Sequence, residues 1–93
     1  MTVEEGFTIC RKGNKLIQGC QSVGDSSRHV SMRICCPNGG TPVGTYHTHP
    51  HGSIAPSSQD IAEMKRLNLE LLCIEVPETG EAKCYRLGNQ HKK

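Results

Sequence analysis

Large aromatic side chains are scarce in this 93-residue chain: it has no tryptophan, one phenylalanine and two tyrosines, 3% of its residues in all. A core without large rings must rest on Ile, Leu, Val, Met and Cys. A chain of this length also buries only a modest fraction of its surface. We therefore expect an additional source of stability, such as a bound metal, disulfide bonds or a second subunit.

Long apolar runs and a strong charge of either sign are also missing. No segment approaches the roughly 20 apolar residues of a membrane span. The N-terminal stretch MTVEEGFTIC does not combine a basic segment with a long apolar one. The formal net charge is only +2, and the basic residues are scattered apart from HKK at 91–93. Composition therefore predicts a single cytoplasmic domain with no membrane and no nucleic-acid partner.

Cysteine, in contrast, is abundant, with six residues at positions 10, 20, 35, 36, 73 and 84. No two of them have the C-x-x-C spacing that is typical of a cysteine-built zinc site. They are either buried thiols that act as small hydrophobes or members of disulfides. The turn PETG would place Cys73 opposite Cys84 on paired strands, near disulfide geometry. Two packed thiols are the simpler expectation for this pair.

Turn residues and hydrophobic periodicity divide the chain into short elements. Strands are predicted at 5–10, 15–20, 29–36, 43–49, 69–76 and 81–87. A helical period follows Ser57, with Ile61, Met64, Leu67 and, less regularly, Leu71 on one face. Ser57 is a good N-cap, and the acidic residue three positions later would complete a capping box. The order β-β-β-β-α-β-β predicts an α/β domain over residues 1–88, with a largely antiparallel sheet packed by one main helix, and a short polar tail at 89–93.

The stretch GTYHTHPHGSIAPSSQD, residues 44–60, contains the residue types of a metal site. His47 and His49 stand two apart on a predicted strand, so both side chains leave the same face. Asp60 follows across a short loop, in the first turn of the predicted helix. Two histidines and a carboxylate leave a fourth tetrahedral position for water, as in catalytic zinc sites. The spacing recommends none of the remaining histidines as ligands: His29, His51 and His91.

The whole stretch decides between a metal site and ordinary polar surface with helix capping. HTHP, six further residues, Ser57, two more residues and Asp60 match every fixed position of the signature H-[ST]-H-P-x6-S-x2-D. This stretch resembles the JAMM (MPN-plus, Mov34-PAD-1-like) zinc metalloproteases, in a minimal form of prokaryotic or viral type. The resemblance extends from residue 4 to residue 87.

The resemblance implies a JAMM/MPN-like (cytidine-deaminase-like) fold in which His47, His49 and Asp60 bind Zn²⁺. It implies that Ser57 hydrogen-bonds the water or the developing oxyanion. The family usually begins with a helix, whereas only three residues precede Glu4 here. We expect a homo-oligomer or cysteine staples to compensate for the uncovered sheet face.

The resemblance also implies a glutamate on an early strand that moves a proton from water to the leaving amine. Glu4 and Glu5 are both candidates. Counting back from the turn RKGN favours Glu4, whereas Thr8 stands three residues after Glu5, where the family places a small residue. The two glutamates point to opposite faces of a strand, so only one can serve.

The implied activity is zinc-dependent peptidase or isopeptidase hydrolysis of an amide bond at the C-terminal tail of a ubiquitin-like or sulfur-carrier protein. Such a tail can bind as an added strand on a sheet edge. The alternatives are a non-catalytic binding or scaffold module of the same fold and a zinc hydrolase of small peptides.

Overall fold

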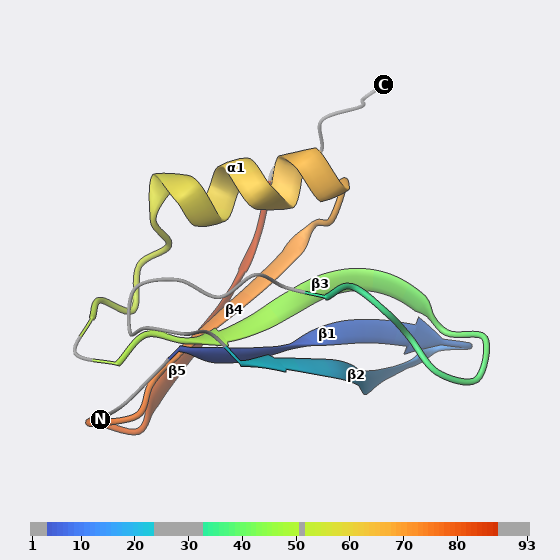
Figure 1. Cartoon of the computed structure of the whole chain (residues 1–93), viewed down its shortest axis with the longest axis horizontal. Helices are drawn as coiled ribbons and strands as arrows, with labels where there is room; N and C mark the ends of the chain where they lie inside the picture. The colour runs from blue at the N-terminus through green and yellow to red at the C-terminus, as the bar shows by residue number, and fades with distance from the viewer. Residues whose placement is uncertain (1–3, 24–32, 51, 88–93) are drawn as a thin grey trace.

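One mixed sheet and one helix make up the part of the chain that the computed structural model describes, residues 4–23, 33–50 and 52–87 (Figure 1). The elements, in chain order, are β1 (Glu5–Lys12), β2 (Lys15–Val23), β3 (Thr41–Thr48), α1 (Ser58–Leu67), β4 (Leu71–Val76) and β5 (Glu81–Arg86). The strand order is β2-β1-β3-β4-β5, with β3 and β4 parallel and the other neighbours antiparallel. The predicted α/β class, largely antiparallel sheet and single main helix are confirmed. The predicted tail at 89–93 lies outside the described residues.

The two hairpins follow from their turn residues. Lys12 pairs with Lys15, so the turn between β1 and β2 consists of Gly13 and Asn14. Gly13 has a φ of 65°, a left-handed conformation that costs glycine little because it has no Cβ. The hairpin between β4 and β5 has the predicted register, with Cys73 directly opposite Cys84.

Local hydrogen bonds determine where α1 begins and ends. The Ser57 side chain accepts from the backbone N–H of Asp60, and the Asp60 side chain accepts from that of Ser57, so the predicted capping box is present. The helix ends at Asn68, which has a φ of 59° and donates its N–H to carbonyls of the last turn. Leu71 therefore belongs to β4 rather than to the helix.

The strand predicted at 29–36 is wrong for its described part. Residues 33–36 are not a strand, and residues 29–32 lie outside the described residues. The backbone of this segment is bound by the Thr8 side chain instead of by a neighbouring strand. The Thr8 hydroxyl donates a hydrogen bond to the Arg33 carbonyl and accepts one from the Cys35 N–H. Since these bonds satisfy the backbone without a ladder, the alternation of this segment did not lead to a strand.

All six cysteines lie in the described residues and form disulfides: Cys10–Cys36, Cys20–Cys35 and Cys73–Cys84. The expectation of packed thiols is therefore wrong, and the expectation of cysteine staples is confirmed. Two of the three bonds fasten residues 35 and 36 to β1 and β2. The third joins β4 to β5. The staples thus secure the segment that has no strand ladder.

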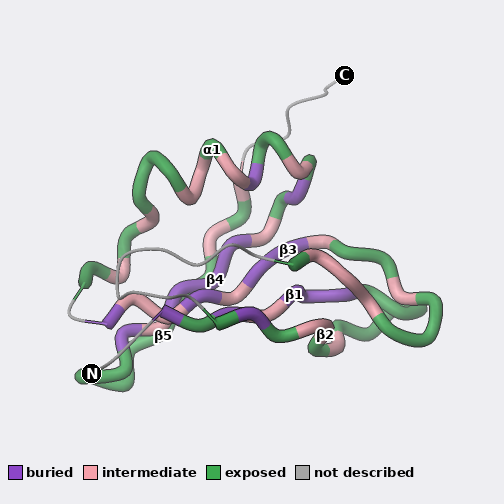
Figure 2. The backbone as a smooth tube through the Cα atoms, in the orientation of Figure 1, coloured by how far each residue is buried: buried purple, intermediate pink, exposed green. Residues whose placement is uncertain are grey.

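The core lies between α1 and the sheet. Met64, Leu69, Leu72 and Ile74 form its buried cluster, and Met64 accepts a hydrogen bond from the buried hydroxyl of Thr45. Figure 2 shows the buried residues running along the central strands beneath the helix. Gly44 allows β3 and β4 to approach, because a Cβ at this position would collide with the Leu71 backbone.

No helix among residues 4–23, 33–50 and 52–87 covers the opposite face of the sheet (Figure 1). Phe7 and Tyr46 stack there with ring centroids 4.8 Å apart. They border a hollow of about 200 Å³ that Glu5 and Glu75 also line. Within the described residues, no helix is long and apolar enough to cross a membrane.

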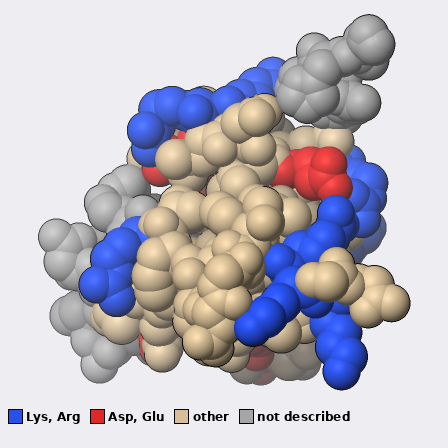
Figure 3. All heavy atoms as spheres, turned by 90° about the vertical axis from the view of Figure 1, so that its right-hand side faces the viewer, with Lys and Arg blue, Asp and Glu red and all other residues tan. Residues whose placement is uncertain are grey.

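Basic side chains gather at the end of the molecule where β1 turns into β2 (Figure 3). Arg11, Lys12 and Lys15 are all exposed there. The carboxyl end of β3, which carries the predicted metal ligands, lies at the other end of the sheet (Figure 1). These three basic residues therefore stand away from the candidate site.

Candidate metal centre

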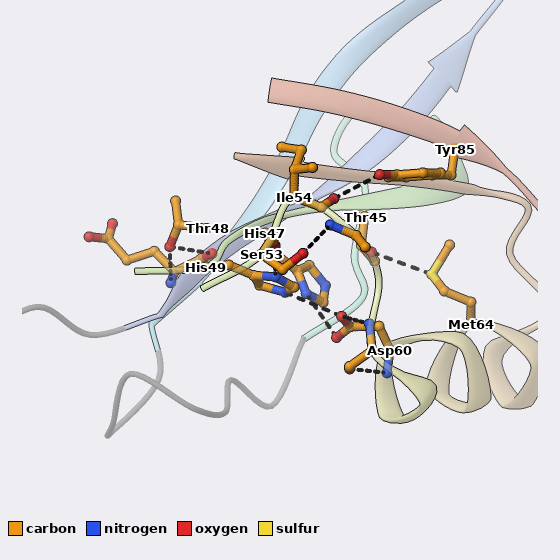
Figure 4. A network of polar contacts seen from close by, with 12 residues as sticks. Thr45, His47, Thr48, His49, Ser53, Ile54, Asp60, Met64 and Tyr85 are labelled. Carbon is orange, nitrogen blue, oxygen red and sulfur yellow. Dashed lines mark hydrogen bonds and ion pairs between the residues drawn. The ribbon is translucent and has the colours of Figure 1, made fainter. Parts of the chain in front are cut away.

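The three predicted ligands meet in space at the carboxyl end of β3 (Figure 4). His47 lies on β3, His49 follows the end of that strand, and Asp60 lies in the first turn of α1. Each offers one ligand atom, and these atoms all lie within 4.8 Å of one another. Because His47 and His49 are two residues apart and side chains alternate between the faces of a strand, both imidazoles lie on the face that α1 covers, as predicted.

Asp60 is held in place by the same capping box that begins the helix. Its Oδ2 atom accepts from the Ser57 backbone N–H at 3.0 Å, and its own N–H donates to Ser57 Oγ at 3.0 Å. Capping and metal binding are therefore not alternatives here. The capping hydrogen bonds orient the Asp60 carboxylate so that its oxygens also face the two histidines.

His49 has both ring nitrogens engaged. Its Nδ1 lies 2.9 Å from the Ser53 carbonyl oxygen, which can only accept, so Nδ1 carries the proton. Its Nε2 faces Asp60 Oδ2 at 3.2 Å. A backbone carbonyl that fixes the tautomer and orientation of an imidazole is the usual outer partner of a metal-binding histidine.

His47 is buried, at 5% exposure, and neither of its ring nitrogens has a hydrogen-bond partner among the described residues. Its Nδ1 lies 3.7 Å from Asp60 Oδ1, which is beyond hydrogen-bond range. Leaving a buried polar group unpaired costs about 1–3 kcal/mol. An ion bound beside Asp60 would give His47 the partner that the protein does not supply.

The electrostatics of the cluster separate the two histidines. Burial lowers the pKa of His47 more than the nearby Asp60 raises it, so this ring is neutral at pH 7. The hydrogen bond to Asp60 raises the pKa of His49. Burial alone would raise the pKa of Asp60, but the hydrogen bonds from His49 and Ser57 outweigh it and lower the pKa from 3.8 to about 2. The centre thus attracts a cation, either a proton or a metal ion.

The residues present fit a zinc ion. Ligand atoms around a tetrahedral zinc lie about 3.3 Å apart, given metal–ligand bonds of about 2.0–2.1 Å. His47 Nδ1 lies 3.7 Å from Asp60 Oδ1 and His49 Nε2 lies 3.2 Å from Asp60 Oδ2, so each histidine stands near that spacing from one oxygen of the carboxylate. Imidazole and carboxylate are suitable donors for zinc. Three protein ligands also leave a coordination position open, as catalytic sites require.

The two candidate glutamates lie on opposite sides of the sheet. Gly6 pairs with His47, and continuing this register two more residues along both strands places Glu4 opposite His49. Glu4 is buried, at 7% exposure. The hydrogen bond with Asp60 is the main reason for the raised pKa of His49, and the charge of Glu4 makes a smaller contribution.

Glu5 faces away from the metal ligands. Its carboxylate accepts from Gln21 at 3.5 Å, and its backbone N–H donates to Thr48 Oγ1 at 2.9 Å. It lines the hollow on the uncovered face. Of the two positions that the sequence left open, the structure places only Glu4 on the ligand side.

Ser57 lies at the helix N-cap, next to the ligand cluster in sequence and structure. Its oxygen accepts from the Asp60 N–H, so its own hydroxyl proton remains available to donate. The three histidines that were not expected to be ligands, His29, His51 and His91, lie outside the described residues.

Sequence reasoning missed two supports of the site. The Ser53 carbonyl holds His49, and the Tyr85 hydroxyl donates to the Ile54 carbonyl at 2.9 Å (Figure 4). Every residue carries a backbone carbonyl, so the sequence gives no sign of which carbonyl binds His49. Tyr85 stands 31 residues from Ile54, and only the fold brings the two together.

In a comparison with known families, the model described as prokaryotic homologs of the JAB domain matches residues 6–88. No curated protein and no solved structure matches the chain. The matched range includes the three candidate ligands and Ser57. It begins just after Glu4 and Glu5, so it does not choose between them.

Proposed function

The chain belongs to the family of prokaryotic homologs of the JAB domain, and on this premise we propose that it is a zinc-dependent peptidase or isopeptidase. One observation carries the proposal. His47, His49 and Asp60 converge at the end of β3, and among the described residues neither ring nitrogen of the buried His47 has a hydrogen-bond partner. A structural role alone gives no reason to bury an unpaired imidazole.

Zinc, when bound, supplies a Lewis acid that activates water for attack on an amide carbonyl. The residues of the chain provide the remaining functions. His47, His49 and Asp60 hold the ion, and the Ser53 carbonyl keeps the Nε2 of His49 directed toward it. Ser57 donates a hydrogen bond through its hydroxyl to the oxyanion that develops on the carbonyl oxygen of the substrate.

Glu4 is the proposed general base. It takes the proton of the attacking water on its carboxylate and delivers it to the nitrogen of the leaving amine. Its burial beside His49 supports this role, since the carboxylate then works near the ligands and away from bulk water. The position of Glu5, which lines the hollow on the other face of the sheet, argues against this role for it.

The proposed substrate is the C-terminal tail of a ubiquitin-like or sulfur-carrier protein, as the family resemblance suggests. The ligands lie on β3, which has β1 on one side and β4 on the other. A tail added beside the edge strand β2 or β5 would lie three strand spacings from β3, about 14 Å at the usual spacing. Such a tail must turn across the strand ends to bring its last peptide bond to the ligands.

Zinc content and cleavage, measured on the same preparations, test the proposal. We expect one zinc per chain in the wild-type protein, none in His49→Ala, and cleavage of a ubiquitin-like fusion only by the zinc-loaded wild type. Zinc without cleavage of any tail fusion would favour the scaffold module, and cleavage confined to short peptides would favour the small-peptide hydrolase. A wild-type protein that binds no zinc would refute the proposed centre.

A further inference from the structure

Tyr85 connects β5 to the loop that follows the metal-binding strand. Its ring packs against the core cluster of α1 and β4, and its hydroxyl donates to the Ile54 carbonyl at 2.9 Å. The side chain of Ile54 packs against the same cluster. This part of the loop is therefore fixed to the sheet at both its backbone and its side chain.

The peptide group just before Ile54, which carries the Ser53 carbonyl, orients the proposed metal ligand His49. The carbonyl of Ser53, the residue before Ile54, accepts from His49 Nδ1 at 2.9 Å. Two other bonds of the loop are local: Gly52 donates to the His49 carbonyl and Ala55 donates to Ser53 Oγ. Gly52, Ser53 and Ala55 are exposed, so burial does not hold this backbone.

We propose that Tyr85 is a positioning residue for the metal ligand His49, acting through the Ile54–Ser53 backbone. This inference rests on the proposed metal centre. The Tyr85 hydroxyl holds the Ile54 carbonyl, which limits rotation of the adjoining peptide and keeps the Ser53 carbonyl facing His49 (Figure 4). Without the hydroxyl, the loop samples orientations in which Nδ1 loses its acceptor and Nε2 turns from Asp60.

The chain offers a matched control, because it has a second tyrosine with one hydrogen bond of the same length. The Tyr46 hydroxyl donates to Glu75 at 2.9 Å on the face of the sheet opposite the metal ligands. Tyr85→Phe and Tyr46→Phe remove the same atom and one hydrogen bond each, and both keep the ring. A difference between them therefore reports what the Tyr85 hydroxyl holds.

The experiment measures the zinc dissociation constant of the wild type and both variants by competition with a chromophoric chelator. We expect zinc to bind about three- to tenfold more weakly to Tyr85→Phe, the size of one outer-shell hydrogen bond. Tyr46→Phe should stay within about twofold of wild type. Exchange of the His49 Nδ1 proton, followed by ¹⁵N NMR on the zinc-loaded proteins, should be faster in Tyr85→Phe alone.

The outcomes separate this inference from the function on which it rests. If the wild type binds zinc and Tyr85→Phe matches it in affinity and in His49 proton exchange, Tyr85 does not position the ligand. Equal weakening by Tyr46→Phe would also overturn the inference, since the effect would then be a general loss of rigidity. Failure of the wild type to bind zinc would overturn the metal centre itself.

Discussion

Replacing His47 by leucine should stabilise the zinc-free protein, although it destroys the proposed site. His47 is buried, and the part of the chain that the structure describes offers no hydrogen-bond partner to either ring nitrogen. Burial also lowers its pKa, so the folded protein keeps a neutral, unsatisfied imidazole. Leucine has a similar size and no polar atom. Removing the unpaired groups should recover about 1–3 kcal/mol of the free energy of unfolding.

The same substitution at His49 should have the opposite sign. His49 Nδ1 donates a hydrogen bond to the Ser53 carbonyl and Nε2 pairs with Asp60 Oδ2 at 3.2 Å, and both interactions are lost in His49→Leu. We expect this variant to lose about 1–2 kcal/mol. Two identical substitutions two residues apart thus act as controls for each other.

Thermal unfolding followed by circular dichroism measures both effects in the presence of EDTA with the disulfides intact. For a domain of this size, 1 kcal/mol corresponds to about 4–8 °C in Tm. The Tm of His47→Leu should therefore rise and that of His49→Leu should fall. With zinc at about 1,000 times its Kd, the wild type alone should gain about 4 kcal/mol.

A fall in Tm for His47→Leu comparable to that for His49→Leu would refute the reasoning. It would mean that His47 is hydrogen-bonded in the zinc-free protein, and the strongest structural sign of a metal at this position would be lost. A zinc response that survives in either leucine variant would exclude that residue as a ligand.

Three further predictions follow from the described residues. Glu4→Gln should keep its zinc and lose about 10²–10⁴-fold in turnover, whereas Glu5→Gln should keep both; equal losses in a cleavage assay would contradict the assignment by sheet face. Thiol titration of the denatured protein should detect no free thiol without reductant and all six after reduction, and free thiols in the unreduced protein would contradict the disulfide pairing. In acid, the zinc-free protein should lose the contribution of Asp60, because its pKa is about 2 in the folded state against 3.8 ordinarily. This contribution is present above pH 3.8 and disappears as the pH falls toward 2, so urea unfolding should show a shallower pH dependence in Asp60→Asn.

The disulfides compensate for the small core. They close loops with sequence separations of 26, 15 and 11 residues, and a 15-residue loop corresponds to about 3 kcal/mol in the chain-entropy model. Disulfides are common inside the cells of hyperthermophiles. In other organisms, stable disulfides indicate a protein of an oxidising compartment. The thiol titration therefore also bears on the predicted cytoplasmic location.

The sequence by itself was sufficient where the information is local. The hairpin turn at Gly13, the capping box of Ser57 and Asp60, and the register of Cys73 against Cys84 depend on residues close together in the chain. The spacing of His47, His49 and Asp60 is local as well, since a strand alternation and one short loop determine which face each side chain occupies.

Tertiary structure decided the features that depend on distant partners. Residues 33–36 alternate like a strand, but the hydroxyl of Thr8 and two disulfides hold them differently. The sequence favours Glu4 only slightly over Glu5, and the pairing of β1 with β3 places the two on opposite faces of the sheet. Packing also leaves His47 unpaired and brings Tyr85 to the loop that orients His49, because contacts between remote segments form only when the sheet and helix assemble.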